Sequence, residues 1–348
     1  MEQREMQKEG VALSTRIPTR HKNDFTVMDK LQQQLPYLLE KARPYACQGH
    51  VPDDIPGLKK VNPQWLGMTI VSASGKEIAV GDVQVRFPLQ SIAKVFALAQ
   101  ALMDQGVEEL FRHVGMEPSG GPVDELPPVS PSAWPRMPRE ARRKPANPLI
   151  DSGAILVSSL MNGETPQEKL HRLLRLIRVI SGNPTVRVNE HVYLSEKKNL
   201  RNRAIAYLLQ EQGCLLTDAE EALDLYAMQC AIEVSCRDLA YMATCLANGG
   251  TVWGLSKPVI PRPIVRVLTA LMVTCGMYDA SGQFAVRVGI PAKSGVSGGI
   301  LAFVPGKYGI GIFGPALDEK GTSIAGVQLL SECVNQWGWS LFESGVKP

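Results

Sequence analysis

The chain has 348 residues, 45% of them hydrophobic and 20% charged, with a formal net charge of +3. That length is sufficient for two subdomains with a sizeable core, and the small net charge excludes the strong field of a typical nucleic-acid-binding protein. No apolar run reaches the about 18 residues of a membrane-spanning helix. We therefore expect neither nucleic acid nor a membrane as a partner.

The N-terminus and the cysteines indicate the cellular compartment. The first residues, MEQREMQKEG, are polar and lack the apolar region of a signal peptide, and we expect residues 1–24 to form a flexible tail. The seven cysteines are odd in number and include no CxxC pair, which is typical of reduced thiols and predicts a cytoplasmic protein. The five histidines show no metal-binding spacing, so we predict no metal and no cofactor.

The first part of the chain predicts a helix, a hairpin and a second helix. Apolar residues recur at helical spacing in both helices, although Pro36 allows a kink or an early end in the first. Ser74-Gly75 is a typical hairpin turn, and Gly106 is a typical helix stop. The predicted elements are a helix over 25–42, strands over 66–73 and 77–80, and a helix over 89–105.

The middle of the chain is expected to be helical after one irregular loop. Nine prolines from Pro118 to Pro148 exclude a regular helix or a central strand there. Helical patterns then continue to about residue 275. One of them begins with a capping box that runs from Thr165 to Glu168.

The C-terminal part returns to short strands and closes with a helix over 322–337. A sheet built from both ends of the chain around a helical insert is typical of an α/β protein of the α+β type, with a mostly antiparallel sheet flanked by helices. The predicted strands are 299–304 and 308–313, the predicted sheet subdomain is 25–88 with 285–348, and the helical subdomain is 89–284.

Ser91-Ile92-Ala93-Lys94 is the first motif that carries chemistry. A serine and a lysine at positions i and i+3 share one helical face. Ser91 falls in the first turn of the predicted helix, where free N–H groups favour a developing oxyanion. A buried Lys94 at its side is suited to take the hydroxyl proton. The motif alone occurs by chance in most chains of this length.

A second motif, Lys293-Ser294-Gly295, precedes a predicted strand about 200 residues later. In enzymes with a Ser-x-x-Lys nucleophile, a Lys-Ser/Thr-Gly triplet on an edge strand faces the serine. Two further glycine-rich runs resemble functional motifs but lack the local structure that those motifs need. Residues 295–299 match a nucleophile elbow but precede a strand, and residues 309–314 match a dinucleotide fingerprint but lie within a strand, where close packing is the better explanation.

Taken in order, these and other segments resemble the serine-dependent glutaminases, from about Gly49 to Leu330. The segments that carry the resemblance include Pro63-Gln64-Trp65-Leu66-Gly67, Phe87-Pro88-Leu89-Gln90-Ser91-Ile92-Ala93-Lys94, Asn147-Pro148 with Gly153-Ala154-Ile155, Cys275-Gly276-Met277-Tyr278-Asp279, and Gly289 through Gly299. The resemblance implies the fold of β-lactamases and DD-peptidases, one domain of about residues 45–340, and a homo-oligomer, either a dimer or a tetramer.

The resemblance also implies a reaction and the residues that perform it. L-Glutamine is the implied substrate, and Ser91 attacks its side-chain amide to form a γ-glutamyl ester that water hydrolyses to L-glutamate. The implied catalytic residues are Ser91, Lys94 and Tyr226. The implied substrate-binding residues are Ser91, Asp151, Glu196, Asn202, Tyr226, Tyr278 and Val296, with the N–H groups of Ser91 and Val296 forming the oxyanion hole.

Three positions depart from the family pattern. Asp151 replaces a substrate-binding asparagine, Asp54 replaces a tyrosine, and Glu196 lies six residues before Asn202 instead of seven. An ionised Asp151 beside the substrate carboxylate is expected to weaken glutamine binding, so that Asp151→Asn improves kcat/KM. Alternatively, Asp151 is protonated or paired with a nearby cation.

These departures leave three functions open. The leading hypothesis is a glutaminase, and the second is an amidohydrolase for another amide, with a cationic group near Asp151 and Asp54. The third is a binding or regulatory protein that has lost efficient turnover. The presence of Ser91, Lys94 and Tyr226 argues against the third function, and the two aspartates favour the second.

Overall fold

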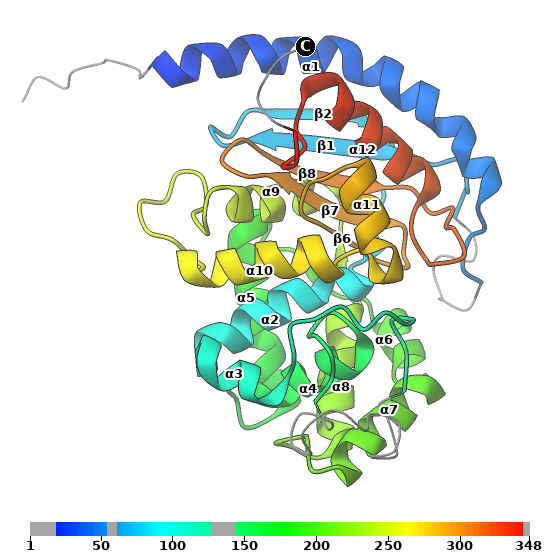
Figure 1. The fold of residues 1–348 in the computed structure, drawn as a ribbon, viewed down its shortest axis with the longest axis vertical. Helices are drawn as coiled ribbons and strands as arrows, with labels where there is room; N and C mark the ends of the chain where they lie inside the picture. The colour runs from blue at the N-terminus through cyan, green and yellow to red at the C-terminus, as the bar shows by residue number, and fades with distance from the viewer. Residues whose placement is uncertain (1–18, 54–60, 127–143, 344–348) are drawn as a thin grey trace, which may run out of the picture.

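The computed structural model describes residues 19–53, 61–126 and 144–343. Figure 1 shows a sheet in the upper part of the molecule, with helices on both of its faces and a group of helices below it. The helices are α1 (Thr19–Ala42), α2 (Ala93–Gln105), α3 (Val107–His113), α4 (Asp151–Leu160), α5 (Pro166–Ser181), α6 (Glu190–Glu196), α7 (Leu200–Glu211), α8 (Ala219–Cys230), α9 (Cys236–Ala247), α10 (Arg262–Cys275), α11 (Ser281–Arg287) and α12 (Ile324–Trp337), with the short 3-10 helices η1 (Arg43–Gln48), η2 (Gln90–Ile92) and η5 (Tyr278–Ala280).

The main sheet has five antiparallel strands in the order β2-β1-β8-β7-β6, so strands from the two ends of the chain pair at its centre. A second, three-stranded sheet has the order β3-β5-β4. This confirms the predicted α+β class and the mostly antiparallel sheet. The strands are β1 (Gly67–Ser72), β2 (Glu77–Gly81), β3 (Phe87–Pro88), β4 (Arg187–Val188), β5 (Ile232–Val234), β6 (Ala292–Ser294), β7 (Gly299–Val304) and β8 (Tyr308–Phe313).

Two hydrophobic layers cover the two faces of the main sheet. On one face, α1 and α12 pack against apolar side chains of β1, β7 and β8 (Figure 1). On the other face, α9 packs directly on β8, β1 and β7. The sheet therefore has both faces buried, which explains why every residue of β1, β7 and β8 is buried.

The glycines of β8 permit the close contact with α9. A Cβ atom at Gly309 would lie 2.1 Å from the amide nitrogen of Thr244 and 2.3 Å from the carbonyl oxygen of Ala240. A Cβ atom at Gly311 would lie 2.2 Å from the Cys236 carbonyl oxygen. The glycine-rich run 309–314 is therefore a packing surface within a strand, as the sequence predicts, and is not a nucleotide-binding turn.

We expect Gly309→Ala to lower the free energy of unfolding by about 3 kcal/mol, because backbone atoms of α9 must move to admit one methyl group. Urea denaturation of the purified variant measures this. Gly282→Ala is the matched control, since a Cβ atom at Gly282 would meet no heavy atom within 4 Å. Equal unfolding midpoints for the two variants would contradict the packing argument.

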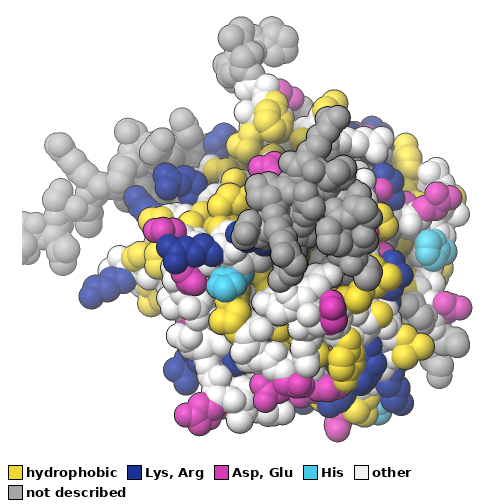
Figure 2. Space-filling view, turned by 60° about the horizontal axis from the view of Figure 1, so that its bottom comes forward, with side chains coloured by type: hydrophobic (Ala, Val, Ile, Leu, Met, Phe, Trp, Pro, Cys, Tyr) yellow, Lys and Arg dark blue, Asp and Glu magenta, His cyan; other side chains and the backbone are white. Residues whose placement is uncertain are grey.

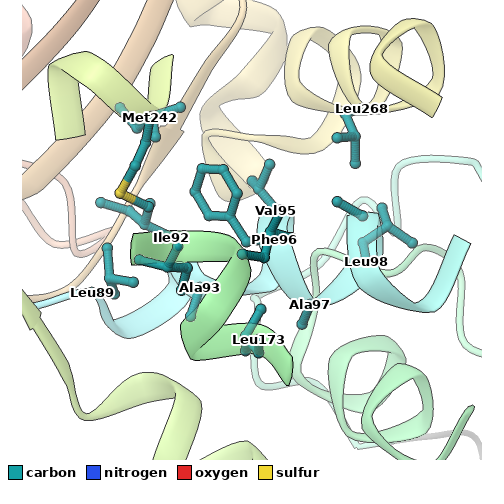
Figure 3. Packing of buried hydrophobic residues seen from close by; sticks show 14 of the residues in the cluster. Leu89, Ile92, Ala93, Val95, Phe96, Ala97, Leu98, Leu173, Met242 and Leu268 are labelled. Atoms are coloured by element: carbon teal, nitrogen blue, oxygen red, sulfur yellow. The ribbon is translucent and has the colours of Figure 1, made fainter. Parts of the chain in front are cut away.

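Helix α2 is the central helix of the molecule and carries the Ser91–Lys94 motif at its start. Val95, Phe96 and Leu98 are fully buried, and the helices α4, α5 and α10 pack against α2. Figure 3 shows Leu173 of α5, Met242 of α9 and Leu268 of α10 around it. Because α2 is enclosed on all sides, the position of its first turn is set by the packing of the whole core.

The predicted helices and strands are present, but several of their ends differ, and the sequence did not predict the short strands β3, β4, β5 and β6. The predicted tail of residues 1–24 includes part of α1, which begins at Thr19 and continues past Pro36. The apolar pattern that starts at residue 25 marks only the packed part of this helix. Ser91 lies in η2 and not in the first α-helical turn, since α2 begins at Ala93.

Three observations bear on charge, membrane crossing and redox state. Figure 2 shows basic and acidic side chains interspersed over the face that it draws. Among the described residues no single helix is long and apolar enough to cross a membrane, and one bent pair, Arg262–Cys275 with Tyr278–Arg287, meets that requirement only with both halves combined. All seven cysteines lie within the described ranges, and each is a free thiol.

Candidate active site

The turn that contains Ser91 is held in a constrained conformation beside the β6–β7 turn. Gln90 has a φ of 50°, in the left-handed region that non-glycine residues seldom adopt. A Cβ atom at Gly295 would lie 2.7 Å from the Leu89 carbonyl oxygen and 3.5 Å from the Gln90 Cβ atom. This close contact places the turn that contains Val296 against the turn that contains Ser91, as an oxyanion hole formed by both requires.

Lys94, Asp151 and Tyr226 form a buried cluster from three helices, α2, α4 and α8. The Lys94 ammonium donates to Asp151 Oδ1 at 2.5 Å and to the Leu149 carbonyl oxygen at 3.3 Å. The Tyr226 hydroxyl donates to the same Asp151 oxygen at 3.0 Å. Lys94 is 1% exposed and Tyr226 is 4% exposed, so neither side chain points into bulk solvent.

The expectation that Asp151 presents an uncompensated negative charge to the substrate is wrong. Its carboxylate forms an ion pair with Lys94, and it begins α4, where the helix N-terminus also stabilises negative charge. The structure therefore favours the alternative in which Asp151 is paired with a cation. The repulsion of a substrate carboxylate by Asp151 is reduced to that of a neutralised pair.

The loop before α4 positions the second acceptor of Lys94. The Asn147 side chain donates to the Glu117 carbonyl oxygen at 3.0 Å and accepts from the Leu149 N–H at 3.0 Å. A Cβ atom at Gly153 would lie 1.9 Å from the Asn147 carbonyl oxygen, so the start of α4 packs tightly against this loop. These contacts hold the Leu149 carbonyl group towards Lys94.

Tyr278 links Ser91 to the edge strand β6. Its φ of 57° is also in the left-handed region. Its hydroxyl donates to the Ser294 carbonyl oxygen at 3.2 Å and is hydrogen-bonded with Ser91. Burial raises the pKa of Tyr278 above its usual range, and these two hydrogen bonds oppose that rise. The phenol is therefore neutral at physiological pH.

Lys293 is a second buried lysine in the same region. It is fully buried, donates to the Ser294 carbonyl oxygen at 2.7 Å, and places its nitrogen 4.0 Å from the centre of the Tyr278 ring. Burial lowers the pKa of Lys293 well below its usual range, the nearby Lys94 charge lowers it further, and Asp151 opposes the change. The two lysines thus differ, because only Lys94 has a carboxylate partner.

Glu196 and Asn202 come from a separate pair of helices, α6 and α7. The Glu196 side chain accepts from Gln90 Nε2 at 2.9 Å, so it reaches the residue that precedes the nucleophile. The shorter spacing between Glu196 and Asn202 is accommodated by the turn at Lys197–Asn199, where Asn199 caps α7. Asn202 is 5% exposed.

The sequence does not reveal every residue of the site. Gln90 immediately precedes Ser91 in the motif, but its role is apparent only from its contact with Glu196. Lys293 belongs to a recognised motif, yet the sequence does not predict it as a site residue. Asp54 and much of the proline-rich loop fall outside the described residues.

A cavity of about 430 Å³ lies beside the cluster. Tyr278, Leu149 and Asn147 contribute to its wall, while Ser91 and Glu196 are not among its lining residues. Tyr278, which is hydrogen-bonded with Ser91, therefore lies between the cavity and Ser91. The remaining lining residues come mainly from Pro118–Gly121 and from Val273–Cys275.

The arrangement combines the groups that acyl transfer needs. A serine hydroxyl lies at the start of a helix, beside a buried lysine–carboxylate–tyrosine cluster that can move protons. The β6–β7 turn packs against the turn that contains Ser91 and can direct backbone N–H groups to it. Glu196 offers a carboxylate beside Gln90, which suits a cationic group.

Comparison with known proteins agrees with this chemistry. The Glutaminase family model matches residues 49–342. The glutaminase of Clostridium tetani is 44% identical over 313 residues, covering 90% of this chain and all of that protein, and that of Geobacillus thermodenitrificans is 44% identical, covering 89% and 98%.

Solved structures match equally well. A probable glutaminase from Bacillus subtilis complexed with 6-diazo-5-oxo-L-norleucine has a TM-score of 0.80 at 38% identity, covering 89% of this chain and 97% of its own. A covalent complex of the Bacillus subtilis glutaminase YbgJ with 5-oxo-L-norleucine has a TM-score of 0.77 at 37% identity, covering 89% and 99%. The predicted β-lactamase-like fold is thereby confirmed, and this chain belongs to the glutaminase family.

Proposed function

We propose that the protein is a glutaminase, an amidohydrolase that converts L-glutamine and water to L-glutamate and ammonia. The observation that carries the proposal is the match of nearly the whole chain to glutaminases at 44% identity. The related Bacillus subtilis enzyme forms a covalent complex with 5-oxo-L-norleucine. That supports a covalent route, in which an enzyme nucleophile attacks the substrate, for this chain as well.

Ser91 is the proposed nucleophile. Its Oγ atom bonds to the side-chain amide carbon, the carbon–nitrogen bond breaks, and ammonia leaves after it receives a proton. Water then hydrolyses the γ-glutamyl ester and restores the Ser91 hydroxyl. The N–H groups of Ser91 and Val296 stabilise the oxyanion in both steps, which the contact between their two turns supports.

The amino-acid end of glutamine is proposed to bind at Glu196, Asn202 and Tyr278. The Glu196 carboxylate pairs with the substrate ammonium. Asn202 donates to the substrate carboxylate, and the Tyr278 hydroxyl turns to it from the Ser294 carbonyl oxygen. Tyr226 and Lys94 serve the proton transfers through Asp151. The hydrogen bond between Gln90 and Glu196 supports this arrangement, because it ties the ammonium site to the nucleophile turn.

Location, assembly and subdomains are also proposals. Seven free thiols, five of them buried, support a reducing compartment such as the cytoplasm. A homo-oligomer, dimeric or tetrameric, follows from the family resemblance only. The division into a sheet subdomain and a helical subdomain over 89–284 likewise stays a proposal, with the qualification that α9, inside that range, packs on the sheet.

The test of the proposal is ammonia release from glutamine, asparagine and small amides under steady-state conditions. We expect glutamine to have a kcat/KM about 100-fold above that of asparagine, because a substrate held at Glu196 and shortened by one methylene leaves its amide short of Ser91. Preference for a small or cationic amide would favour an amidohydrolase with another substrate. Inactivity with every amide would favour a binding or regulatory protein.

A further inference from the structure

The hydrogen bonds of the Lys94 side chain bear on its role in proton transfer. An ammonium has three N–H groups and no acceptor. Two of the Lys94 hydrogens are directed to acceptors, Asp151 Oδ1 and the Leu149 carbonyl oxygen. The third remains for the side of Ser91, which shares the helical face of Lys94. The geometry therefore suits an ammonium that is hydrogen-bonded to a carboxylate.

The electrostatics of the cluster favour the same state. Lys94 and Asp151 are buried together, and separating either from its partner would leave an uncompensated charge in a nonpolar region. Tyr226 and the N-terminus of α4 both stabilise Asp151 as a carboxylate. Lys293 lacks a carboxylate partner, and burial lowers its pKa well below the usual range.

We propose that Asp151, acting through Lys94, is the proton acceptor for the Ser91 hydroxyl in this protein, and that Lys94 works as an ammonium. This inference rests on the proposed function and assigns the origin of its base. The family pattern has asparagine at this position, and an amide cannot hold the proton. In this chain a carboxylate that can take the proton lies 2.5 Å from Lys94 Nζ.

Each step of the proposed reaction conserves protons and charge. As the Ser91 Oγ–carbon bond forms, Lys94 passes one proton to Asp151 Oδ1 and takes the serine proton in its place. Asp151 becomes a neutral acid, and Lys94 remains an ammonium. When the carbon–nitrogen bond breaks, the proton returns from Asp151 through Lys94 to the leaving nitrogen, which departs as ammonia. Hydrolysis of the ester repeats the sequence, with water as donor and Ser91 as final recipient.

Other titratable groups near Asp151 do not produce the same pH dependence. Burial raises the pKa of Tyr226 and of Tyr278, so both are neutral on the acid side. Removing the Asp151 charge lowers the pKa of Lys293 further, which shifts any contribution from it to lower pH. Glu196 is present unchanged in every variant compared. The groups that face Asp151 are Lys94 on α2, Tyr226 and Cys230 on α8, Glu196 on α6, Tyr278 on η5 and Lys293 on β6.

The test is the acid limb of kcat/KM for glutamine in wild type, Asp151→Asn and Asp151→Glu. Wild type and Asp151→Glu should share one acid limb, with a lower kcat for Asp151→Glu, because both have a carboxylate beside Lys94. In Asp151→Asn an amine must replace the carboxylate as the base, so the limb should lie at least about one pH unit higher, with a loss of about tenfold per pH unit below it.

A shift of the acid limb to lower pH in Asp151→Asn overturns the inference. That shift is expected if Lys94 is the base in wild type and in the variant, because Asp151 would then only stabilise the proton on Lys94. An acid limb that lies at the same pH in wild type and Asp151→Asn overturns it as well. Asp29→Asn, an exposed ion-pair change on α1, is the control and should leave the profile unchanged. Wild type inactive on glutamine at every pH would instead remove the proposed function, and the inference with it.

Discussion

Replacing Ser91 with alanine should abolish ammonia release from glutamine, lowering kcat by about 10⁴-fold or more. Without the Oγ atom no ester forms, and the remaining groups only position substrate and water. The fold should be retained, because Ser91 is a small residue, 8% exposed, at the edge of the core. The measurement is steady-state ammonia release, with the unfolding midpoint recorded for the same samples.

Reaction with 6-diazo-5-oxo-L-norleucine provides an independent readout of the same substitution. Wild-type protein should gain one 5-oxo-norleucine adduct by intact mass, as the covalent complex of the Bacillus subtilis relative suggests. Ser91→Ala should gain none. Ser331→Ala, a serine of similar burial on α12, is the matched control and should react like wild type. Adduct formation on Ser91→Ala would place the nucleophile elsewhere.

Replacing Lys94 with arginine should lower kcat about 10³-fold. The guanidinium keeps the positive charge and can still pair with Asp151, but it does not release a proton and so cannot pass one between Ser91 and Asp151. Lys94 is 1% exposed, and the larger planar group also has little room beside the Leu149 carbonyl group. Single-turnover ammonia release separates this chemical step from product release.

Lys169, a buried lysine outside the site, provides the control for Lys94→Arg. Lys169 on α5 is 5% exposed and donates to the Ser159 carbonyl oxygen, away from the cluster. Lys169→Arg should therefore cost stability without a comparable loss of kcat. Activity of Lys94→Arg within about tenfold of wild type would contradict a proton-transfer role and leave Lys94 only a structural charge.

Much of the fold could be predicted from local pattern alone. The strands over 299–304 and 308–313 match β7 and β8 residue for residue, and the hairpin turn at Ser74-Gly75 is correct. These elements are encoded by short-range signals, namely alternating apolar residues and glycines at turns. The capping residue Thr165 likewise accepts from the Glu168 N–H, because a cap involves only neighbouring positions.

The family, and Ser91 and Lys94 as the proposed reacting pair, also lay within reach of the sequence. Ser91 and Lys94 are three residues apart, so any helical turn places them on one face. The sequence did not reveal that the turn is a 3-10 helix with Gln90 in a left-handed conformation. That conformation depends on the contact with Gly295, which is distant in the chain.

The sequence by itself determined the family and most of the secondary-structure elements, since each depends on residue types at fixed spacing. Only the tertiary structure decided the charge state of the site. Asp151 reads as an unpaired acid in the sequence, and the packing of α2 against α4 and α8 places it on Lys94 and Tyr226. The same packing buries Lys293 without a carboxylate partner. Electrostatic energies depend on distance and burial in three dimensions, and residue spacing along the chain specifies neither.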